Sequence, residues 1–139
     1  MPLIELQDVS KLYGFGDATT LALDEVSLAI QENEFVAVMG PSGCGKSTLM
    51  NVIGLLDRPT HGNYVLRGRY VSKLRSGQRA KIRRDTVGFV FQSFNLLPRM
   101  TVLENVALPL VYKGLSLKRR IMQASNMIER VGLREREFY

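Results

Sequence analysis

The feature that most constrains this chain is a glycine-rich loop in its first third. The apolar run 35–39 comes directly before this loop and predicts a strand that is buried on both faces. The loop fits the pattern of Gly, any four residues, Gly, Lys and then Ser or Thr, in Gly40-Pro41-Ser42-Gly43-Cys44-Gly45-Lys46-Ser47-Thr48. Apolar residues then recur at helical spacing, at Leu49, Val52, Ile53 and Leu56. Strand, loop and helix in this order are the context that the motif requires.

This order gives the loop a defined chemistry. Its glycines permit dihedrals that side chains forbid, so the backbone amides can turn inward and form an anion-binding nest. A helix beginning near Lys46 adds the positive end of its dipole. We expect Lys46 to reach the β- and γ-phosphates of a nucleotide, and the Ser47 hydroxyl to ligate Mg²⁺. The alternative, a glycine-rich turn with no ligand, does not account for the full pattern in this context.

The composition limits the class of protein to which the chain can belong. The chain has 139 residues, of which 45% are hydrophobic and 23% charged, as in a globular protein with one core. We expect a soluble, intracellular protein, because no apolar stretch approaches the roughly 20 residues of a membrane span and the N-terminus lacks a signal-peptide pattern. Cys44 is the only cysteine, which excludes a disulfide within the chain.

The net charge of +6 is concentrated in residues 66–84, which contain eight Lys and Arg residues and no acid. Such a block is typical of a solvated face, and less often it meets nucleic acid or anionic lipid. No aromatic ladder accompanies it, so we expect no nucleic-acid partner.

The first half of the chain reads mainly as strands. Residues 3–9 alternate as in a half-buried strand, and 21–30 read as strand with a break or bulge at Asp24 and Glu25. Asn33 is suited to a left-handed turn. We expect the helix after the glycine-rich loop to run to about Leu56, ended by Pro59.

The second half reads as short strands and helices. The sequence predicts strands at 62–66 and 86–91, and between them a basic helix capped by Ser72 and ending near Arg84. Thr101 and Glu104 form a capping box for a helix that we expect to stop near Pro109. Ser116 opens a last helix, which Gly132 ends and whose apolar face over 117–131 we expect in the core.

Taken together, these residues resemble the nucleotide-binding domain of ABC transporters. Tyr13 matches the aromatic residue that stacks on adenine in that family, and 88–92 (GFVFQ) matches the strand and Q-loop, whose glutamine is Gln92 here. Residues 99–106 match the segment that faces the membrane partner. Three segments are similar in sequence to the branch of this family that serves lipoprotein release and macrolide export: GPSGCGKSTLMNVIG, GFVFQSFNLLP and ENVALPL.

This resemblance implies an α/β fold, a P-loop NTPase of ABC type with an antiparallel N-terminal β subdomain, an incomplete parallel core sheet and the start of a helical subdomain. It implies ATP and Mg²⁺ as cofactors, bound by Tyr13, the loop 40–48 and Gln92, with Ser47 and Gln92 at the metal. It implies a permease in the membrane and a second nucleotide-binding domain, in a homodimer, as partners. The expected place is the cytoplasmic side of the cell membrane, as a peripheral subunit.

The chain also departs from the family pattern. Asn33 stands where the family usually has Gly. No segment matches the signature loop, the Walker B strand with its acidic pair, the D-loop or the switch His. We therefore expect one ABC-type nucleotide-binding domain over 1–139, truncated before the signature and Walker B motifs, with no catalytic residue in this chain and little hydrolysis by the chain alone.

Two other interpretations stay open from the sequence. One is a truncated nucleotide-binding fragment that does not hydrolyse ATP. The other is a different phosphate-loop enzyme, such as a kinase or a GTPase. Tyr13 and the GFVFQ segment count against this second interpretation, and no Asn-Lys-x-Asp motif for guanine is present.

Overall fold

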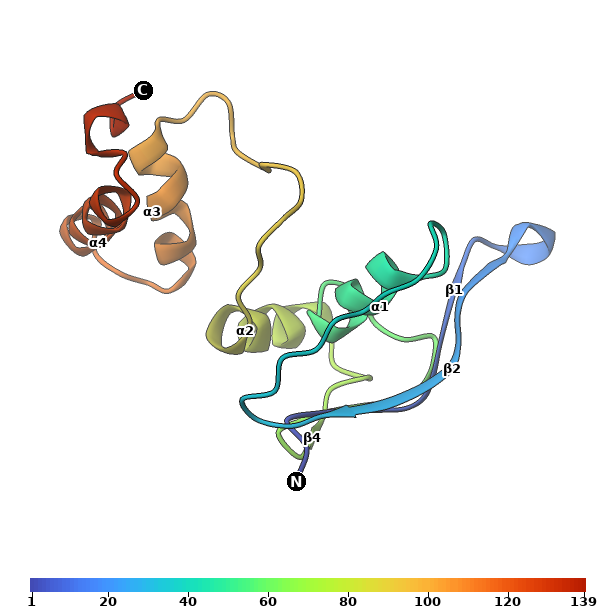
Figure 1. Ribbon diagram of the computed structural model, residues 1–139. Coiled ribbons are helices and arrows are strands. Elements are labelled where there is room, and N and C mark those ends of the chain that lie inside the picture. The colour runs from blue at the N-terminus through green and yellow to red at the C-terminus, as the bar shows by residue number, and fades with distance from the viewer. The chain divides into compact units, whose positions relative to one another are not determined.

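A computed structural model describes all residues from 1 to 139. The chain divides into an N-terminal unit, Met1–Gly88, and a C-terminal unit, Phe89–Tyr139. The N-terminal unit carries the sheet, the glycine-rich loop and two helices, whereas the C-terminal unit is helical (Figure 1). No helix in the chain combines the length and the hydrophobicity that a membrane span needs.

The N-terminal unit is built on a four-stranded antiparallel sheet with the strand order β2-β1-β3-β4. Its strands are β1 (Ile4–Tyr13), β2 (Thr20–Ile30), β3 (His61–Leu66) and β4 (Arg69–Tyr70). A long hairpin joins β1 to β2, with Leu6 opposite Leu28 and Tyr13 opposite Thr20. The predicted antiparallel N-terminal sheet is therefore confirmed.

The predicted irregularity in β2 and the predicted left-handed turn after it are also found. The pairing of β1 with β2 shifts register on both sides of Val9, and Glu25 has a φ of 44°. Both changes are typical of a β-bulge, which adds a residue to one strand and increases the local twist. Asn33 has a φ of 61°, the left-handed conformation that asparagine tolerates best after glycine.

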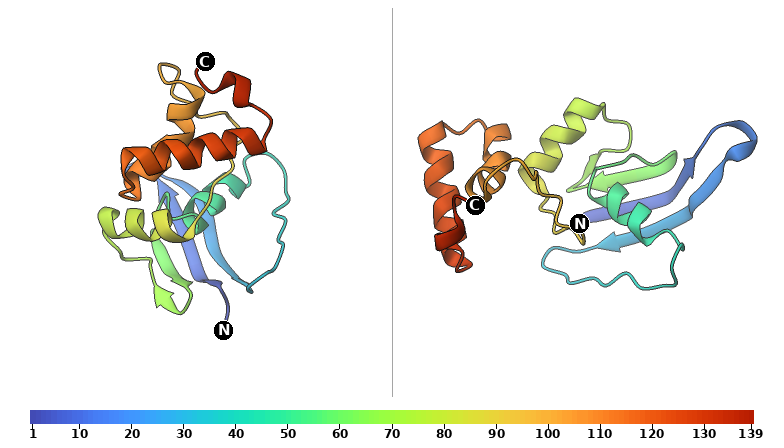
Figure 2. Two further views of the ribbon diagram at one scale, coloured as in Figure 1. Left: turned by 90° about the vertical axis from the view of Figure 1, so that its left-hand side faces the viewer. Right: turned by 90° about the horizontal axis from the view of Figure 1, so that it is seen from above.

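The core of this unit lies between one face of the sheet and α1 (Lys46–Ile53), which crosses that face (Figures 1 and 2). Leu6 and Val9 of β1 pack there with Leu49 and Val52 of α1. Tyr64 of β3 is 1% exposed, and its hydroxyl donates a 2.8 Å hydrogen bond to the Ile53 carbonyl. Burial raises the pKa of Tyr64 to about 12. The sheet thus fixes the position of α1.

Helix α1 ends earlier than the sequence predicts, at Ile53 instead of near Leu56, and so Pro59 does not end it. The Gly54 amide donates to the Met50 carbonyl, and Leu55 then takes a left-handed φ of 59°. That turn places the Leu55 side chain in the core, where it is 1% exposed. Burial of a leucine side chain stabilises by roughly 1.5–3 kcal/mol, which outweighs the helical propensity of these residues.

The basic helix is α2 (Ser76–Thr86), and its predicted cap was wrong. Arg75 occupies the N-cap position, where its backbone amide donates a 3.0 Å hydrogen bond to Gln78 Oε1. The Ser72 hydroxyl accepts a 2.6 Å hydrogen bond from the Tyr64 amide instead. Ser72 is buried, and its hydroxyl bonds to β3 instead of capping α2.

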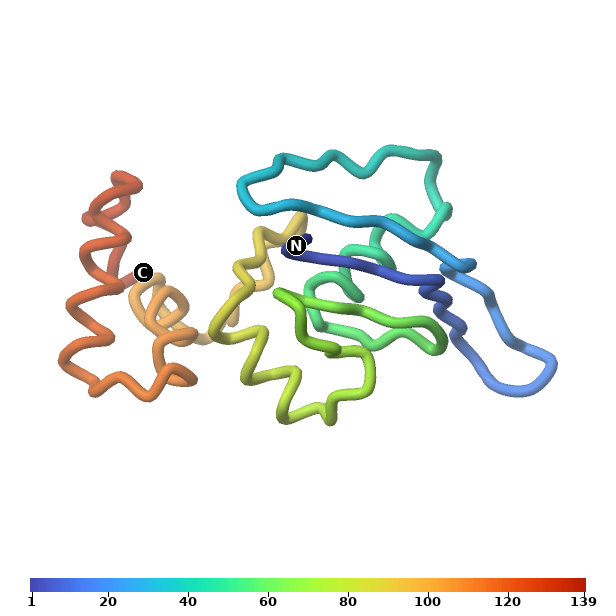
Figure 3. The backbone as a smooth tube through the Cα atoms, turned by 90° about the horizontal axis from the view of Figure 1, so that it is seen from below, coloured from blue at the N-terminus to red at the C-terminus, as the bar shows by residue number.

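The two apolar runs expected as buried parallel strands, 35–39 and 86–91, pair with no strand. Phe35 is 96% exposed and Met39 is 86% exposed. The segment between β2 and α1 loops out beside β2 before the chain enters the helix (Figure 3). A strand needs hydrogen-bonding neighbours on its edges, and every ladder in this chain is antiparallel, so the expected parallel core sheet is not formed.

The C-terminal unit contains α3 (Val102–Tyr112) and α4 (Leu117–Arg130), which pack against each other. The predicted capping box is confirmed, because the Thr101 hydroxyl accepts from the Glu104 amide and Glu104 accepts from the Thr101 amide at 2.8 Å. The expected stop at Pro109 was wrong. Pro109 lies inside α3, one turn from its end, where a missing amide donor removes one hydrogen bond of the last turn.

Helix α4 begins after Ser116, and the chain turns at Gly132 with a φ of 74°, both as predicted. Its apolar face is only partly in the core. Ala124 and Ile128 are buried, whereas Leu117 and Val131 at its two ends are exposed. Helix α3 covers only the middle of this apolar face, so the expected core packing is found at Ala124 and Ile128 and not at the two ends.

Candidate functional site

The glycine-rich loop lies at the N-terminus of α1, directly against β2. Gly45 is the N-cap of α1 and has a left-handed φ of 93°. A Cβ atom at Gly45 would lie 2.4 Å from the carbonyl oxygen of Ala22 in β2, so only glycine fits. Gly43 has a φ of 81° but faces open space. The two glycines therefore have different roles. Gly43 only lets the backbone turn, whereas Gly45 also lets the loop approach β2 closely.

The loop leaves a series of backbone amides without acceptors in the protein. The Cys44 amide lies 3.4 Å from the Pro41 carbonyl oxygen, and the Leu49 amide donates to Gly45. The amides of Ser42 and Gly43, and those over 45–48, donate to no group of the protein. Unpaired amides at a helix N-terminus, on a left-handed turn, are the donor set that binds phosphate.

The Lys46 ammonium lies over the same loop. Its Nζ donates a 2.8 Å hydrogen bond to the Gly40 carbonyl oxygen, donates to the Pro41 carbonyl oxygen, and lies 3.5 Å from Cys44 Sγ. The lysine thus closes the loop on itself through neutral acceptors. Phosphate oxygens are stronger acceptors for an ammonium group, because both partners are then charged.

The residues after Lys46 supply hydroxyl groups. Ser47 is exposed at the first turn of α1, and its side chain makes no hydrogen bond in the structure. No three His, Cys, Asp or Glu residues gather into a metal site anywhere in the chain. This donor set fits Mg²⁺ as nucleotide-bound Mg²⁺ is held in proteins, with few protein ligands and several oxygens from phosphate and water.

Tyr13 is the last residue of β1, and its ring is held by two neighbours. Its hydroxyl donates a 3.0 Å hydrogen bond to Asp57 Oδ2. The Lys11 ammonium lies over the ring, 4.9 Å from the ring centroid, which is cation–π geometry. Lys11 also forms a salt bridge with Asp57 Oδ1 at 2.8 Å. Lys11, Tyr13 and Asp57 therefore form one connected cluster, called here the Tyr13 cluster.

The charges in the Tyr13 cluster shift its pKa values in opposite directions. Burial raises the pKa of Tyr13, the hydrogen bond to Asp57 raises it further, and the Thr48 hydroxyl acts against both. Burial alone would raise the pKa of Asp57, but hydrogen bonds from Lys11, the Arg58 amide and Tyr13 bring that pKa below its ordinary value. At neutral pH the hydroxyl of Tyr13 is therefore a donor and the carboxylate of Asp57 an acceptor.

A surface cavity of about 740 Å³ adjoins the Tyr13 cluster. Its lining includes Lys11, Tyr13, Phe15, Arg58, Thr60 and Lys73. Tyr13 and the glycine-rich loop belong to the same unit, and α1 leads from the loop to the turn that carries Asp57. The structure thus brings the predicted base-stacking residue and the predicted phosphate loop onto one scaffold.

Gln92 belongs to the C-terminal unit, where it is exposed and lies outside any helix or strand. The structure does not bring Gln92 and Ser47 into one unit. The assignment of Gln92 to a magnesium ion stays a prediction.

Sequence reasoning missed Lys11 and Asp57. A signal for Lys11 was present, because residues i and i+2 of a strand point to the same face, and Lys11 precedes Tyr13 by two. Asp57 had no such signal, since it comes 44 residues after Tyr13 and meets it only through the fold.

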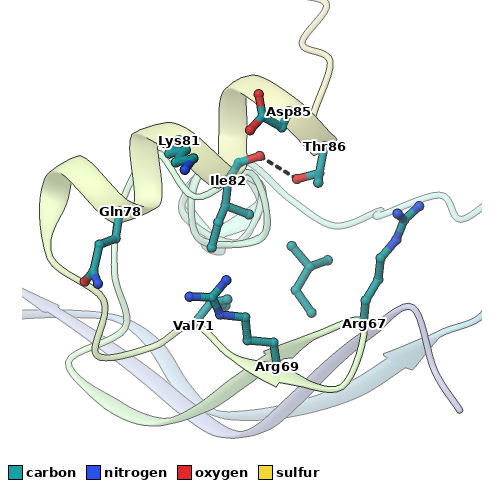
Figure 4. A pocket seen from close by; sticks show the side chains of 9 residues that line it. Arg67, Arg69, Val71, Gln78, Lys81, Ile82, Asp85 and Thr86 are labelled. Carbon is teal, nitrogen blue, oxygen red and sulfur yellow. Dashed lines mark hydrogen bonds between the residues drawn. The ribbon is translucent and has the colours of Figure 1, made fainter.

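The basic block over 66–84 is not only a solvated face. Three of its cations, Arg67, Arg69 and Lys81, line a surface cavity of about 490 Å³ between the β3–β4 hairpin and α2 (Figure 4). Leu66 and Val71 contribute apolar atoms to the same cavity. The cavity lies apart from the Tyr13 cluster, and no residue lines both cavities.

The loop, its unpaired amides and Lys46 are the features of a phosphate-binding loop at a helix N-terminus. The family model described as "ABC transporter" matches residues 23–138, and the chain belongs to this family. The match includes the loop and parts of both units, whereas β1 with Tyr13 lies before it.

Several curated relatives are similar over almost the whole chain. A macrolide export ATP-binding/permease protein MacB of Hyphomonas neptunium is 53% identical over 97% of this chain and 21% of its own length. An uncharacterized ABC transporter ATP-binding protein of Bacillus subtilis, YvrO, is 47% identical over 99% of this chain and 60% of its own length. The chain thus spans a fifth to three fifths of the relatives it matches.

Solved structures show the same fold. The ATP-binding cassette MJ0796, in a dimeric post-hydrolysis state bound to ADP and Pi, superposes with a TM-score of 0.86 at 44% sequence identity. That match covers 97% of this chain and 60% of the cassette. The α/β fold class predicted from the sequence is confirmed by this likeness.

Proposed function

We propose that this chain is the nucleotide-binding part of an ATPase that couples ATP binding and hydrolysis to export or lipoprotein release through a membrane permease. The observation that carries the proposal is the glycine-rich loop at the N-terminus of α1, with its unpaired amides at 42–43 and 45–48 and the Lys46 ammonium above it. These groups are all hydrogen-bond donors, which is the donor set that a phosphate group requires.

The nucleotide contacts that we propose combine this loop with the residues that the family resemblance implies. The loop residues 40–48 hold the phosphates, Lys46 exchanges its carbonyl partners for phosphate oxygens, and Ser47 ligates Mg²⁺. Tyr13 stacks on the base, and Gln92 completes the metal site. Hydrolysis belongs to the whole protein, because polarising the attacking water needs a group that this site does not contain.

The partners are a permease and a second nucleotide-binding domain. The MJ0796 cassette is dimeric in its solved structure, which supports the same association here. The name of the MacB relative joins an ATP-binding part to a permease, which supports coupling to a membrane protein. The place that fits these partners is the cytoplasmic face of the cell membrane.

Calorimetric titration of the full chain with Mg-ATP tests the proposal. Lys46→Ala should lose at least tenfold in affinity, because a hydrogen bond to a charged group contributes roughly 1.5–3 kcal/mol. Lys81→Ala removes the same charge from α2, in the same unit, and should bind as the parent does. Equal affinity of the parent and Lys46→Ala would refute the phosphate site.

A further inference from the structure

We propose that Asp57 is a positioning residue for the base-stacking Tyr13, and that with Lys11 it decides which face of the Tyr13 ring receives the base. The proposal rests on the proposed function, and names two residues of the same site that the sequence analysis did not find. Neither residue belongs to the glycine-rich loop or to the segments that carry the family resemblance.

Tyr13 needs such support because of its place in the chain. It ends β1, and Gly14 follows with a left-handed φ of 97°, so the strand does not continue past the ring. Phe15, on the loop after it, is 95% exposed and gives the ring no cover. Tyr13 itself is 40% exposed. A ring at a strand end with this exposure samples several rotamers unless a specific contact selects one.

Asp57 supplies that contact. Its Oδ2 accepts from the Tyr13 hydroxyl at 3.0 Å, and its Oδ1 accepts from Lys11 Nζ at 2.8 Å and from the Arg58 amide at 2.7 Å. The carboxylate is therefore held by two other groups before it holds the tyrosine. The Asp57 amide itself donates to the Asn51 carbonyl of α1 at 3.1 Å, which ties this support to the helix.

Lys11 determines which face of the Tyr13 ring is open to a base. Its ammonium lies over the ring at 4.9 Å from the centroid, and it donates to the Arg58 carbonyl oxygen at 2.9 Å as well as to Asp57. Lys11 is only 8% exposed, so its position over the ring is fixed by burial and by these two acceptors. A base cannot stack on the face that the ammonium covers. The opposite face of Tyr13 is the one that remains for it.

Helix α1 links Asp57 to the phosphate loop within the same unit. Helix α1 carries Lys46 and Ser47 in its first turn, and Asp57 follows its last turn. Eight residues of α-helix span roughly 12 Å, and the Ile53 carbonyl is fixed to the sheet by Tyr64. Helix α1 thus connects the phosphate loop to the turn that carries Asp57, and the Thr48 hydroxyl of its first turn also acts on the Tyr13 hydroxyl.

The test compares two ligands, Mg-ATP and magnesium tripolyphosphate, which has no base, by calorimetry on the full chain. Tyr13→Phe removes only the hydroxyl and leaves the Lys11–Asp57 pair intact. We expect roughly three- to tenfold weaker binding of Mg-ATP and unchanged binding of tripolyphosphate. Asp57→Asn should give the same pattern, and the double variant should lose no more than either single variant.

The outcomes separate this inference from the proposed function. If the parent chain binds neither ligand, the proposed function fails. If the parent binds both and Tyr13→Phe binds Mg-ATP as tightly as the parent, the positioning role fails and the phosphate site stands. Equal losses for both ligands would show a structural role alone, which also overturns the inference. Because Asp57→Asn leaves Lys11 buried without its partner, Tyr13→Phe is the deciding variant if Asp57→Asn does not fold.

Discussion

The contact between Gly45 and β2 can be tested by adding a single methyl group. In Gly45→Ala the new Cβ would lie 2.4 Å from the Ala22 carbonyl oxygen and 3.2 Å from the Leu23 side chain. Gly43→Ala is a matched control in the same loop. Its φ of 81° is close to the 93° of Gly45, but nothing lies within 4 Å of its new Cβ. The pair therefore separates backbone strain from steric overlap.

The expected magnitudes follow from these two terms. A left-handed alanine costs roughly 1–2 kcal/mol, and a smaller unfolded-state entropy offsets roughly 0.4–1 kcal/mol of this, in both variants. Overlap with a backbone carbonyl adds the cost of overpacking, roughly 1–3 kcal/mol, in Gly45→Ala alone. The free energy of opening the N-terminal unit should therefore fall by about 1–3 kcal/mol more in Gly45→Ala than in Gly43→Ala.

Hydrogen exchange with mass spectrometry measures this difference, because peptides from β1 and β2 report on the N-terminal unit alone. Amides of β2 near Ala22 should exchange roughly 5- to 150-fold faster in Gly45→Ala than in Gly43→Ala. Peptides from α3 and α4 should be the same in both. Equal protection of β2 in the two variants would mean that the loop does not rest on this strand, and the close approach of Gly45 to β2 would be refuted.

Three further outcomes are expected. Thr101→Ala should lower the stability of the C-terminal unit by about 1 kcal/mol, through the lost N-cap of α3, and equal melting of parent and variant would contradict this. Burial opposes ionisation of Asp57, but hydrogen bonds from Lys11, the Arg58 amide and Tyr13 hold its pKa below the ordinary value. Its pairing with Lys11 therefore stabilises the fold above the unfolded-state pKa of about 4 and is lost as the pH falls through the lowered pKa. Acid unfolding followed by circular dichroism should therefore be less steep in Asp57→Asn. Cys44 is exposed beside Lys46, so bound Mg-ATP should slow its alkylation, measured by mass spectrometry, and equal rates would remove Cys44 from the phosphates.

Local patterns in the sequence determined much of this protein. The helix beginning at Lys46, the antiparallel strands of the first thirty residues, the left-handed Asn33 and the capping box at Thr101 were all predicted correctly. Each of these depends on interactions within a few residues, or on alternation along one strand. Sequence spacing reports such interactions directly.

Several helix limits were not predictable in this way. The end of α1 depends on the burial of Leu55 against the sheet, and Ser72 is used by Tyr64 across the β3–β4 hairpin instead of by α2. Propensity favours or disfavours a helix at a given residue, but a buried contact with a distant residue outweighs it. The apolar runs at 35–39 and 86–91 show the same limit for strands, because an apolar sequence does not supply the neighbours that a ladder needs.

Part of the candidate site was likewise predictable from local sequence, and part depended on tertiary contacts. The sequence by itself identified the candidate phosphate loop, since a run of nine residues carries both its glycines and its lysine, and it singled out Tyr13 by resemblance. Only the tertiary structure decided what holds that ring. Asp57 meets Tyr13 across 44 residues of chain, because α1 crosses the sheet and the turn after the helix brings Asp57 back to the end of β1. A contact of that kind depends on the path of the backbone through space, which no local pattern records.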